Sequence, residues 1–402
     1  MARSVLAGAS LVLPDRLAEG HTLVIEDGRI AEIVAGPRAA SPGEHRVDAR
    51  GCLVVPGFID VHVHGAAGSD VLDGPAALAD VARALPRWGV TAFCPTSVAC
   101  APAVLDRFLE AVGRRRARPA EGARVLPAHL ESNFINPEFR GAQPAACLRR
   151  PAAPRRDDEA FSGADILAVI DRRRSDVGVV TLAPEIDGGL DLTRSLVAAG
   201  LRVSMGHSGA SFDEAQAAIA AGARRATHLF NRMRPMAHRD PGLAGAVLAS
   251  EDVAAELICD GVHVHPAVLR VACAAKDPSR VMAITDGTAG SGLPPGARAT
   301  LGGQPITVGD VARLADGTMA GSVATMDRVF RCLTGDCGFD VVQAAHMTST
   351  TPARELGLLG HGVIAVGAAA DLVVLDARLE VVSTWIDGVA RFDRTGAAAP
   401  GS

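Results

Sequence analysis

The sequence predicts an α/β fold: a (β/α)8 TIM-like barrel with a small β-sandwich module formed by both chain ends. Eight short apolar segments alternate with stretches in which Ala, Leu and Val recur at helical spacing. Both ends of the chain instead consist of short apolar runs separated by turn residues. A chain of 402 residues that is 48% hydrophobic has enough apolar material for a barrel core and a second, smaller core.

The β module is predicted from two separate segments. Near the start, apolar runs at 11–13, 22–25 and 29–34 are interrupted by Glu26-Asp27-Gly28, which is typical of a hairpin turn. Near the end, apolar runs at 370–375 and 381–386 are followed by Asp387-Gly388. We therefore expect residues 1–54 and 360–402 to form the module and residues 55–359 to form the barrel.

The barrel is predicted from its count of strand candidates, because eight parallel strands are what a closed (β/α)8 barrel requires. Helical spacing of apolar residues fills the gaps between them, for example at 76–84, 102–112 and 212–221. The eight candidates are Gly57–His64, Val90–Thr96, Arg124–Glu131, Gly178–Glu185, Arg202–His207, Ala226–Phe230, Glu256–Val264 and Val281–Asp286.

Composition excludes several classes of function. The net charge is −5, from 45 acidic and 40 basic residues, and the longest basic runs are three arginines at 114–116 and at 172–174, so we expect no nucleic-acid partner. No apolar run approaches membrane-spanning length, so we expect no membrane association. The eight cysteines are scattered without a C-x-x-C pair, which is typical of reduced thiols in a cytoplasmic enzyme.

Histidines and acidic residues gather at the ends of the strand candidates. His62 and His64 end the first strand, where a period of two places them on the same side. Either one, taken alone, is also compatible with an ordinary strand-end residue. Because the carboxyl ends of barrel strands converge on one mouth, the wider set predicts a divalent metal site there. That set is His62, His64, Glu131, His207, His228 and Asp286.

The same set allows one ion or two. His62 and His64 are suited to one ion and His207 and His228 to another, with the Glu131 carboxylate between them. Imidazole and carboxylate ligands favour zinc, with iron or another transition metal as the alternative. A bound metal assists amide hydrolysis, which also needs a proton carrier, and Asp286 at the end of the eighth strand is placed for that role. Its alternative interpretation is a helix N-cap.

Ordered motifs along nearly the whole chain resemble the N-acetylglucosamine-6-phosphate deacetylases of the amidohydrolase superfamily. No single motif is specific, but their combination and order are. They are PGFIDVHVHG from Pro56, HLESNFINPEFRGA from His129, LAPE from Leu182, GHSGAS from Gly206, THLFNRM from Thr227, DPGLAGA from Asp240, DGVHV from Asp260, TDGTAGSGLP from Thr285 and DGTMAGS from Asp316.

The resemblance implies roles for individual residues. It implies that Glu131, His207 and His228 hold the main metal ion, that Asp286 is the catalytic acid and base, and that His62 and His64 support a second ion. It further implies that His263 polarises the acetyl carbonyl. Asn231 and Arg239 would bind the sugar phosphate, Arg239 from the neighbouring subunit of a homodimer. From the residues alone, the alternatives are that His263 is a hydrogen-bonded histidine at a strand end, Asn231 a turn residue and Arg239 a solvated charge.

Three departures from the usual family pattern bear on the substrate. Ser132 and Asn133 replace a Gly-Pro pair, and Gln143 replaces a histidine that normally touches the sugar. Gln143 still donates and accepts hydrogen bonds but carries no charge. Arg232 stands where alanine is common, and it offers charge-assisted bonds to a phosphate if it is not simply an exposed arginine.

The predicted reaction is hydrolysis of the acetamide of N-acetylglucosamine 6-phosphate, or a close N-acetylhexosamine 6-phosphate, to acetate and the amino sugar phosphate. One alternative is an amidohydrolase acting on a different N-acyl substrate, since Ser132, Asn133 and Gln143 are expected to line the sugar pocket. The other is a catalytically silent barrel that only binds a sugar phosphate.

Overall fold

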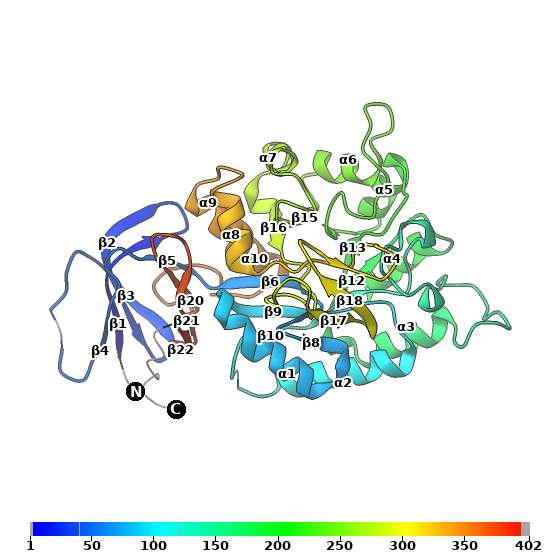
Figure 1. Ribbon diagram of the computed structural model, residues 1–402. Coiled ribbons are helices and arrows are strands. Elements are labelled where there is room, and N and C mark those ends of the chain that lie inside the picture. Colours follow the sequence, from blue (N-terminus) through cyan, green and yellow to red (C-terminus); the bar gives the residue numbers. More distant parts are fainter. Residues whose placement is uncertain (1–2, 40, 120, 395–402) are drawn as a thin grey trace.

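A computed structural model describes residues 3–39, 41–119 and 121–394, and its largest unit is the predicted barrel (Figure 1). Parallel strands follow one another around it, and a bridge between Val63 and Gly287 joins the first strand to the end of the last. The strands are β6 (Phe58–Val63), β9 (Val90–Ser97), β10 (Arg124–Val125) with β11 (Ala128–Glu131), β12 (Val177–Leu182), β13 (Arg202–Met205), β14 (Arg225–Ala226), β15 (Ala254–Ile258) and β16 (Val281–Ile284).

Several barrel strands end earlier than the sequence predicts. β13 stops at Met205, β14 at Ala226 and β16 at Ile284, although the predicted strands run on to His207, Phe230 and Asp286. The reason is the backbone: His207, His228, Phe230 and Asp286 all have φ between +31° and +77°, which no strand accommodates. The third predicted strand is also divided in two at Leu126-Pro127, where Pro127 has no N–H to donate.

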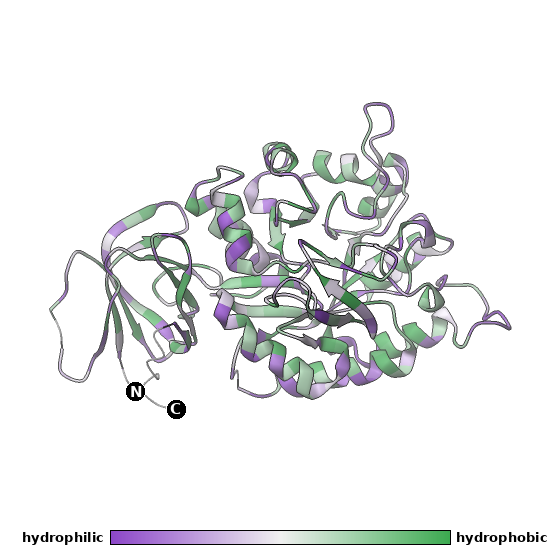
Figure 2. Cartoon of the chain, viewed as in Figure 1, coloured by the Kyte–Doolittle hydropathy of each residue, from purple (hydrophilic) through white to green (hydrophobic). Residues whose placement is uncertain are grey.

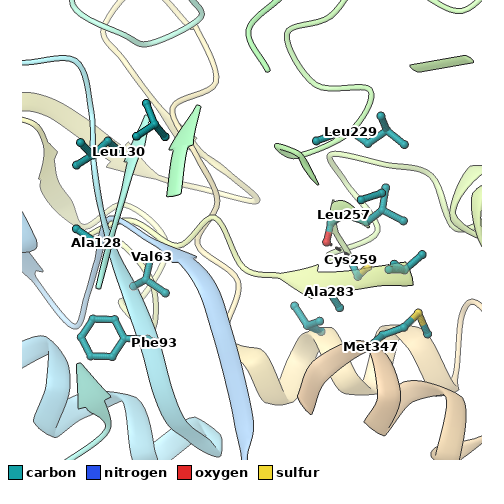
Figure 3. Packing of buried hydrophobic residues seen from close by; sticks show 14 of the residues in the cluster. Val63, Phe93, Ala128, Leu130, Leu229, Leu257, Cys259, Ala283 and Met347 are labelled. Atoms are coloured by element: carbon teal, nitrogen blue, oxygen red, sulfur yellow. Dashed lines mark hydrogen bonds between the residues drawn. The ribbon is translucent and has the colours of Figure 1, made fainter. Parts of the chain in front are cut away.

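Helices cover the outside of the barrel, and their apolar faces pack on the outward side chains of the strands. Figure 3 shows part of this core, with Phe93 in one region and Leu257, Cys259 and Met347 in another. Across the described residues, no helix is both long and apolar enough to cross a membrane. The helices are α1 (Pro75–Ala84), α2 (Pro102–Arg116), α3 (Gly163–Arg172), α4 (Gly189–Ala198), α5 (Phe212–Ala220), α6 (Gly242–Ala249), α7 (Pro266–Ala275), α8 (Met326–Thr334), α9 (Val341–Ala345) and α10 (Thr351–Leu356).

Both ends of the chain contribute to one sheet beside the barrel, with its own apolar core around Leu6, Leu23 and Trp385 (Figures 1 and 2). β5 pairs with β1 on one side and β20 on the other, so the early and late segments meet at β5. The boundaries 1–54 and 360–402 remain our proposed division into domains. The strands are β1 (Ser4–Val12), β2 (Leu17–Glu26), β3 (Arg29–Ala35), β4 (His45–Asp48), β5 (Leu53–Pro56), β20 (Leu372–Leu375), β21 (Val381–Ile386) and β22 (Val389–Asp393).

A small sheet that the sequence did not predict follows the last barrel strand. It consists of β17 (Arg298–Leu301), β18 (Gln304–Val308) and β19 (Ala312–Arg313), which pack around Ile306 and Val308. Its β17–β18 turn is tied to the barrel loops, because Gly302 N donates to Asp70 Oδ2 at 2.6 Å and Gln304 Nε2 donates to Ala142 O at 2.8 Å. The insertion thereby brings Leu301 to the cavity at the barrel mouth.

A buried carboxylate links the barrel to the module. Asp371 Oδ2 accepts from Arg124 Nη1 and from His361 Nδ1, both at 2.9 Å, and Asp371 Oδ1 accepts from Asp387 N at 2.9 Å. Burial on its own raises the pKa of Asp371, but His361 and Arg124 outweigh it and hold the pKa below its ordinary value. The ionised Asp371 carboxylate therefore stabilises the folded protein above about pH 4, and this stabilisation is lost as the pH falls through the folded-state pKa of Asp371.

Asp371→Asn is expected to lower the free energy of unfolding at pH 7 by about 1.5–3 kcal/mol, the range for a hydrogen bond to a charged group, because Arg124 loses this partner and keeps only Asp387. The difference in Tm from the unmodified protein should narrow as the pH falls below about 4, since the native carboxylate is then protonated too. Calorimetry across this pH range measures both effects. Asp191→Asn, in an exposed pair with Arg194, is the control and should shift Tm little. A Tm difference that stays constant down to pH 2 would contradict the assignment.

Candidate active site and metal centre

Three predicted ligands meet at the carboxyl ends of β11, β13 and β14. Glu131 Oε1 lies 2.9 Å from His207 Nε2 and 2.8 Å from His228 Nε2, and the two Nε2 atoms are 3.1 Å apart. All three side chains are buried. One carboxylate oxygen and two imidazole nitrogens thus converge on one point from three different strand ends.

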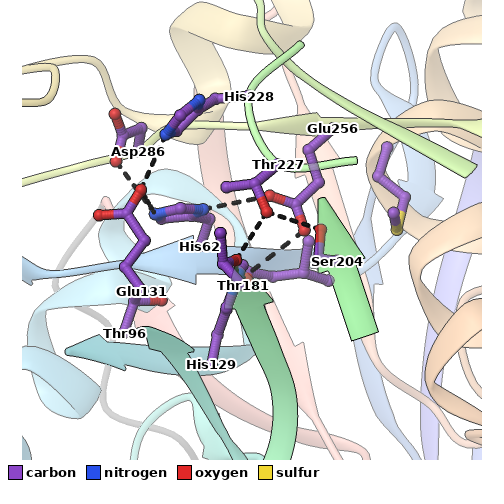
Figure 4. Close-up of polar contacts among 12 residues, drawn as sticks. His62, Thr96, His129, Glu131, Thr181, Ser204, Thr227, His228, Glu256 and Asp286 are labelled. Carbon is purple, nitrogen blue, oxygen red and sulfur yellow. Dashed lines mark hydrogen bonds and ion pairs between the residues drawn. The ribbon is translucent and has the colours of Figure 1, made fainter. Parts of the chain in front are cut away.

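A second group of predicted residues lies against the first, and Figure 4 shows its His62 and Asp286 beside Glu131 and His228. The Nε2 atoms of His62 and His64 are 3.2 Å apart, and each lies 3.2 Å from Asp286 Oδ1. Glu131 stands between the two groups, with Oε1 at 3.7 Å from His62 Nε2 and Oε2 at 3.6 Å from His64 Nε2. The structure therefore brings all six predicted residues together.

Hydrogen bonds at the Nδ1 atoms of the histidines determine which ring nitrogen faces the centre. His64 Nδ1 lies 3.0 Å from Thr96 O and His207 Nδ1 lies 2.9 Å from Phe139 O. Because a carbonyl only accepts, each Nδ1 carries the proton and each Nε2 presents a lone pair to the centre. His62 Nδ1 faces a carboxylate oxygen of Glu256 at 3.1 Å, so it too carries a proton and His62 turns Nε2 toward the centre. His228 Nδ1 has no hydrogen-bond partner among the described residues.

The electrostatics of the cluster call for a cation at its centre. Burial lowers the pKa of His62, but Asp286, Glu256 and Glu131 outweigh it and raise the pKa to about 9. Burial likewise raises the pKa of Asp286, but His62 and His64 bring it down to about 2. These shifts show that the carboxylates attract a positive charge at this point, which a proton on His62 supplies when no metal is bound and which a divalent cation would supply in its place. The donor set thus fits a divalent metal ion of the kind that binds N and O ligands.

The site is built on strained backbone. His207, His228 and Asp286 have φ of 48°, 31° and 51°, in the left-handed region that costs a residue other than glycine roughly 1–3 kcal/mol. The turn after β13 is held by Glu185, whose carboxylate accepts from Ser208 Oγ at 2.7 Å and Gly209 N at 2.6 Å. Asn136 N donates to His207 O at 3.0 Å. Glu185 therefore stabilises the turn that directs His207 to the centre.

A cavity opens at the barrel mouth, beside the cluster of predicted metal ligands and Asp286. Four of the five predicted substrate-binding residues line it: Gln143, Asn231, Arg232 and His263. Its apolar lining includes Ile258, Leu301 and Met319, of which Leu301 comes from the β17–β19 insertion. Arg239 is the exception. It is exposed on the loop before α6 and lies outside the cavity lining of this chain.

Gln143 has protein partners for both polar atoms of its side chain. Its Oε1 accepts from Ala99 N at 2.7 Å, and its Nε2 donates to Glu131 Oε2. Gln143 thus orients Glu131, a predicted metal ligand, and presents only its remaining N–H and lone pair to the cavity. A direct contact between Gln143 and substrate remains a prediction.

The expectation that Ser132 and Asn133 line the sugar pocket is wrong, because neither belongs to the cavity lining. Ser132 Oγ donates to Thr181 O at 2.6 Å. Asn133 Nδ2 donates to Cys100 O at 2.8 Å and to Cys147 O at 2.7 Å. Both side chains are buried and stabilise neighbouring loops instead.

His263 is oriented by a carboxylate. Its Nδ1 lies 2.7 Å from Asp260 Oδ2, and its backbone N donates to Asp260 Oδ1 at 2.8 Å. Asp260 thus accepts the Nδ1 proton and fixes the orientation of the imidazole, which lines the cavity. Asp260 is the first residue of the DGVHV motif, and its role follows only from this contact.

Residues 53–391, more than half of the chain, match the amidohydrolase family. The chain belongs to the amidohydrolase family. The fold and the donor set of this amidohydrolase agree with that assignment, and it is a hydrolase that acts on an amide bond.

The amidohydrolase is similar to curated and solved proteins over almost all of its length. N-acetylglucosamine-6-phosphate deacetylase of Rattus norvegicus is 39% identical over 395 residues, 93% of each chain. N-acetylgalactosamine-6-phosphate deacetylase of Escherichia coli O157:H7 is 36% identical over 388 residues, covering 96% of this chain and 98% of the relative. A structure is also known for a mutant N-acetyl-D-glucosamine-6-phosphate deacetylase from Mycobacterium smegmatis in complex with N-acetyl-D-glucosamine-6-phosphate. It matches this chain with a TM-score of 0.86 at 34% identity, and the match covers 97% of this chain and 100% of the other.

Sequence reasoning missed several charged residues around the centre of the amidohydrolase. Asp60 is fully buried two residues before His62, and its Oδ2 accepts from Thr285 Oγ1 at 2.5 Å. Glu256 and Arg225 lie inside the barrel on β15 and β14. A signal was available for Glu256, because a carboxylate within the apolar run VAAELIC requires a buried partner.

Proposed function

We propose that this amidohydrolase hydrolyses the acetamide of N-acetylglucosamine 6-phosphate, or a close N-acetylhexosamine 6-phosphate, to acetate and the amino sugar phosphate. The observation that carries the proposal is the cavity, in which Glu131, His207, His228 and Asp286 lie beside Arg232. This arrangement offers amide-cleaving groups and a cation for phosphate in one space. Two relatives named for amino sugar phosphates that differ in the sugar support the substrate class, and the choice of sugar is left to experiment.

The residues that would hold metal divide into two sets. Glu131, His207 and His228 would bind the main ion, and His62 and His64 would bind a second with Glu131 between them. Zinc is the proposed metal, with iron or another transition metal as the alternative. When bound, a divalent metal makes water more acidic and polarises a carbonyl group, which favours attack on an unactivated amide.

Asp286 is proposed to move the proton. Its carboxylate is ionised, so it accepts a proton from the attacking water as the oxygen bonds to the acetyl carbon. Asp286 then returns that proton to the sugar nitrogen as the C–N bond breaks, which releases the amine and acetic acid, and the acid loses its proton to become acetate. His263, held by Asp260, is proposed to donate from Nε2 to the carbonyl oxygen, where negative charge develops.

The sugar phosphate is proposed to bind to Asn231 and Arg232. Both line the cavity, and neither the Asn231 amide nor the Arg232 guanidinium is committed to a carboxylate among the described residues. Arg239 is proposed to reach the phosphate of a neighbouring subunit, since it is exposed and outside its own cavity. The proposal thus includes a homodimer. A cytoplasmic location is proposed separately, from the scattered cysteines without a C-x-x-C pair.

Arg232→Ala is expected to raise KM for the phosphorylated sugar roughly 10- to 100-fold, the equivalent of losing one charged hydrogen bond of about 1.5–3 kcal/mol. Turnover of the unphosphorylated sugar should change little, because it has no phosphate to lose. Steady-state kinetics with both sugars measures the two effects. Arg234→Ala is the control, since Arg234 pairs with Asp240 at 3.1 Å outside the cavity. Equal losses on both sugars would rule out a phosphate contact.

A further inference from the structure

A buried ion pair lies inside the barrel beneath the metal centre. Glu256 on β15 is 0% exposed and Arg225 on β14 is 1% exposed. Glu256 Oε1 accepts from Arg225 Nη2 at 3.1 Å. Burying two charges in a barrel interior is costly unless they are paired, and the pair adds little net stability over apolar side chains of similar size. Stability alone therefore does not account for this pair, and its contact with a neighbouring histidine is relevant to its function.

The second oxygen of Glu256 contacts a predicted metal ligand. Glu256 Oε2 lies 3.1 Å from His62 Nδ1, on the side of the ring away from the centre (Figure 4). Because the carboxylate can only accept, Nδ1 carries the proton and Nε2 faces His64 and Asp286 with its lone pair. The outer nitrogens of His64 and His207 face neutral backbone carbonyls instead. A charged partner on an imidazole increases the basicity of the ligating nitrogen.

His129 lies beside this pair, and His62, His129 and Glu256 offer ligand atoms close together, as a separate metal site would. Two contacts exclude it. His129 Nδ1 faces Val61 O at 3.1 Å and so carries a proton, while His129 Nε2 faces Thr181 Oγ1 at 2.7 Å. The Arg225 guanidinium occupies the other side of Glu256 and would repel a cation. The cluster therefore supports the metal centre and does not itself bind an ion.

We propose that Glu256, held by Arg225, is a positioning residue that fixes the ring of His62 and thereby sets the affinity of the His62–His64 pair for a second divalent cation. This inference rests on the proposed function for the identity of the ligands. An ion held by Glu131, His207 and His228 should be largely independent of the Glu256 side chain, because no hydrogen bond or ion pair among the described residues joins those three side chains to it.

Glu256→Gln tests the inference, because glutamine keeps the size of the side chain and removes its charge. Metal-free protein is dialysed against graded zinc, and bound zinc is quantified per chain. The unmodified protein is expected to bind two ions, and the variant to bind the first with unchanged affinity and the second about 10- to 100-fold more weakly. One ion on the unmodified protein, equal weakening of both ions, or no change would each overturn the proposal.

The double variant Glu256→Gln with Arg225→Met separates positioning from folding. The single variant leaves Arg225 buried without its partner, whereas the double variant removes both charges and should recover Tm. The proposal expects the second-ion defect to persist in the double variant at recovered Tm, and recovery of second-ion affinity would overturn it. Zinc binding is measured without substrate, so a protein that behaves as expected here but releases no acetate would contradict only the proposed function.

Discussion

Asp286→Asn is expected to lower kcat by about 10²- to 10⁴-fold, the range that a positioned general acid and base contributes. The carboxylate lies 3.2 Å from the Nε2 atoms of both His62 and His64, at the mouth of the barrel and on the cavity. Asparagine keeps the shape of the side chain but neither accepts the proton from water nor returns it to the amine. The loss should therefore fall on kcat, with a smaller change in KM.

The measurement combines turnover with bound metal per chain, because Asp286 is close enough to the predicted ligands to affect them. Asp277→Asn serves as the control: Asp277 is an exposed N-cap residue before β16, at the opposite end of that strand from Asp286, and asparagine caps equally well. Near-full turnover by the Asp286 variant with unchanged metal content would show that another group carries the proton.

Much of the barrel could be predicted from the sequence, because its strands are apolar runs buried on both faces and separated by helical periodicity. What could not be predicted is where the strands end. His207, His228 and Asp286 each lie two residues beyond the last residue of a strand, and nothing in the sequence signals the left-handed backbone that terminates the ladder there. The β17–β19 insertion was also missed, because its short strands resemble ordinary loop sequence between Arg298 and Arg313.

The candidate site was more predictable than its surroundings. The His and Glu candidates follow strand ends, and strand ends converge in a barrel, so their meeting follows from topology alone. The partners that orient them do not follow a local pattern. Glu256 and His62 are 194 positions apart, and Gln143 reaches back to Glu131 through a loop of irregular shape. Such contacts depend on three-dimensional packing and not on spacing along the chain.

Removing the metal is expected to have an effect at least as large as that of any single substitution. Polarisation of the reacting groups by a divalent ion contributes several kcal/mol, so chelation should lower the rate of acetate release by about 10³-fold or more. Return of zinc should restore the rate without refolding, because the proposed ligands Glu131, His207 and His228 come from the ends of barrel strands, and Gln143 and Phe139 O hold Glu131 and His207 by hydrogen bonds. Circular dichroism of the metal-free protein checks that the fold persists.

The central claim is metal-dependent deacetylation of an amino sugar phosphate, and acetate release tests it most directly. Chelated and zinc-reconstituted protein would each be given N-acetylglucosamine 6-phosphate, its galactosamine epimer and unphosphorylated N-acetylglucosamine. The account predicts acetate only from the reconstituted protein, with higher kcat/KM for a phosphorylated sugar. Undiminished release by the chelated protein, or no release from any of the three sugars with zinc bound, would contradict it.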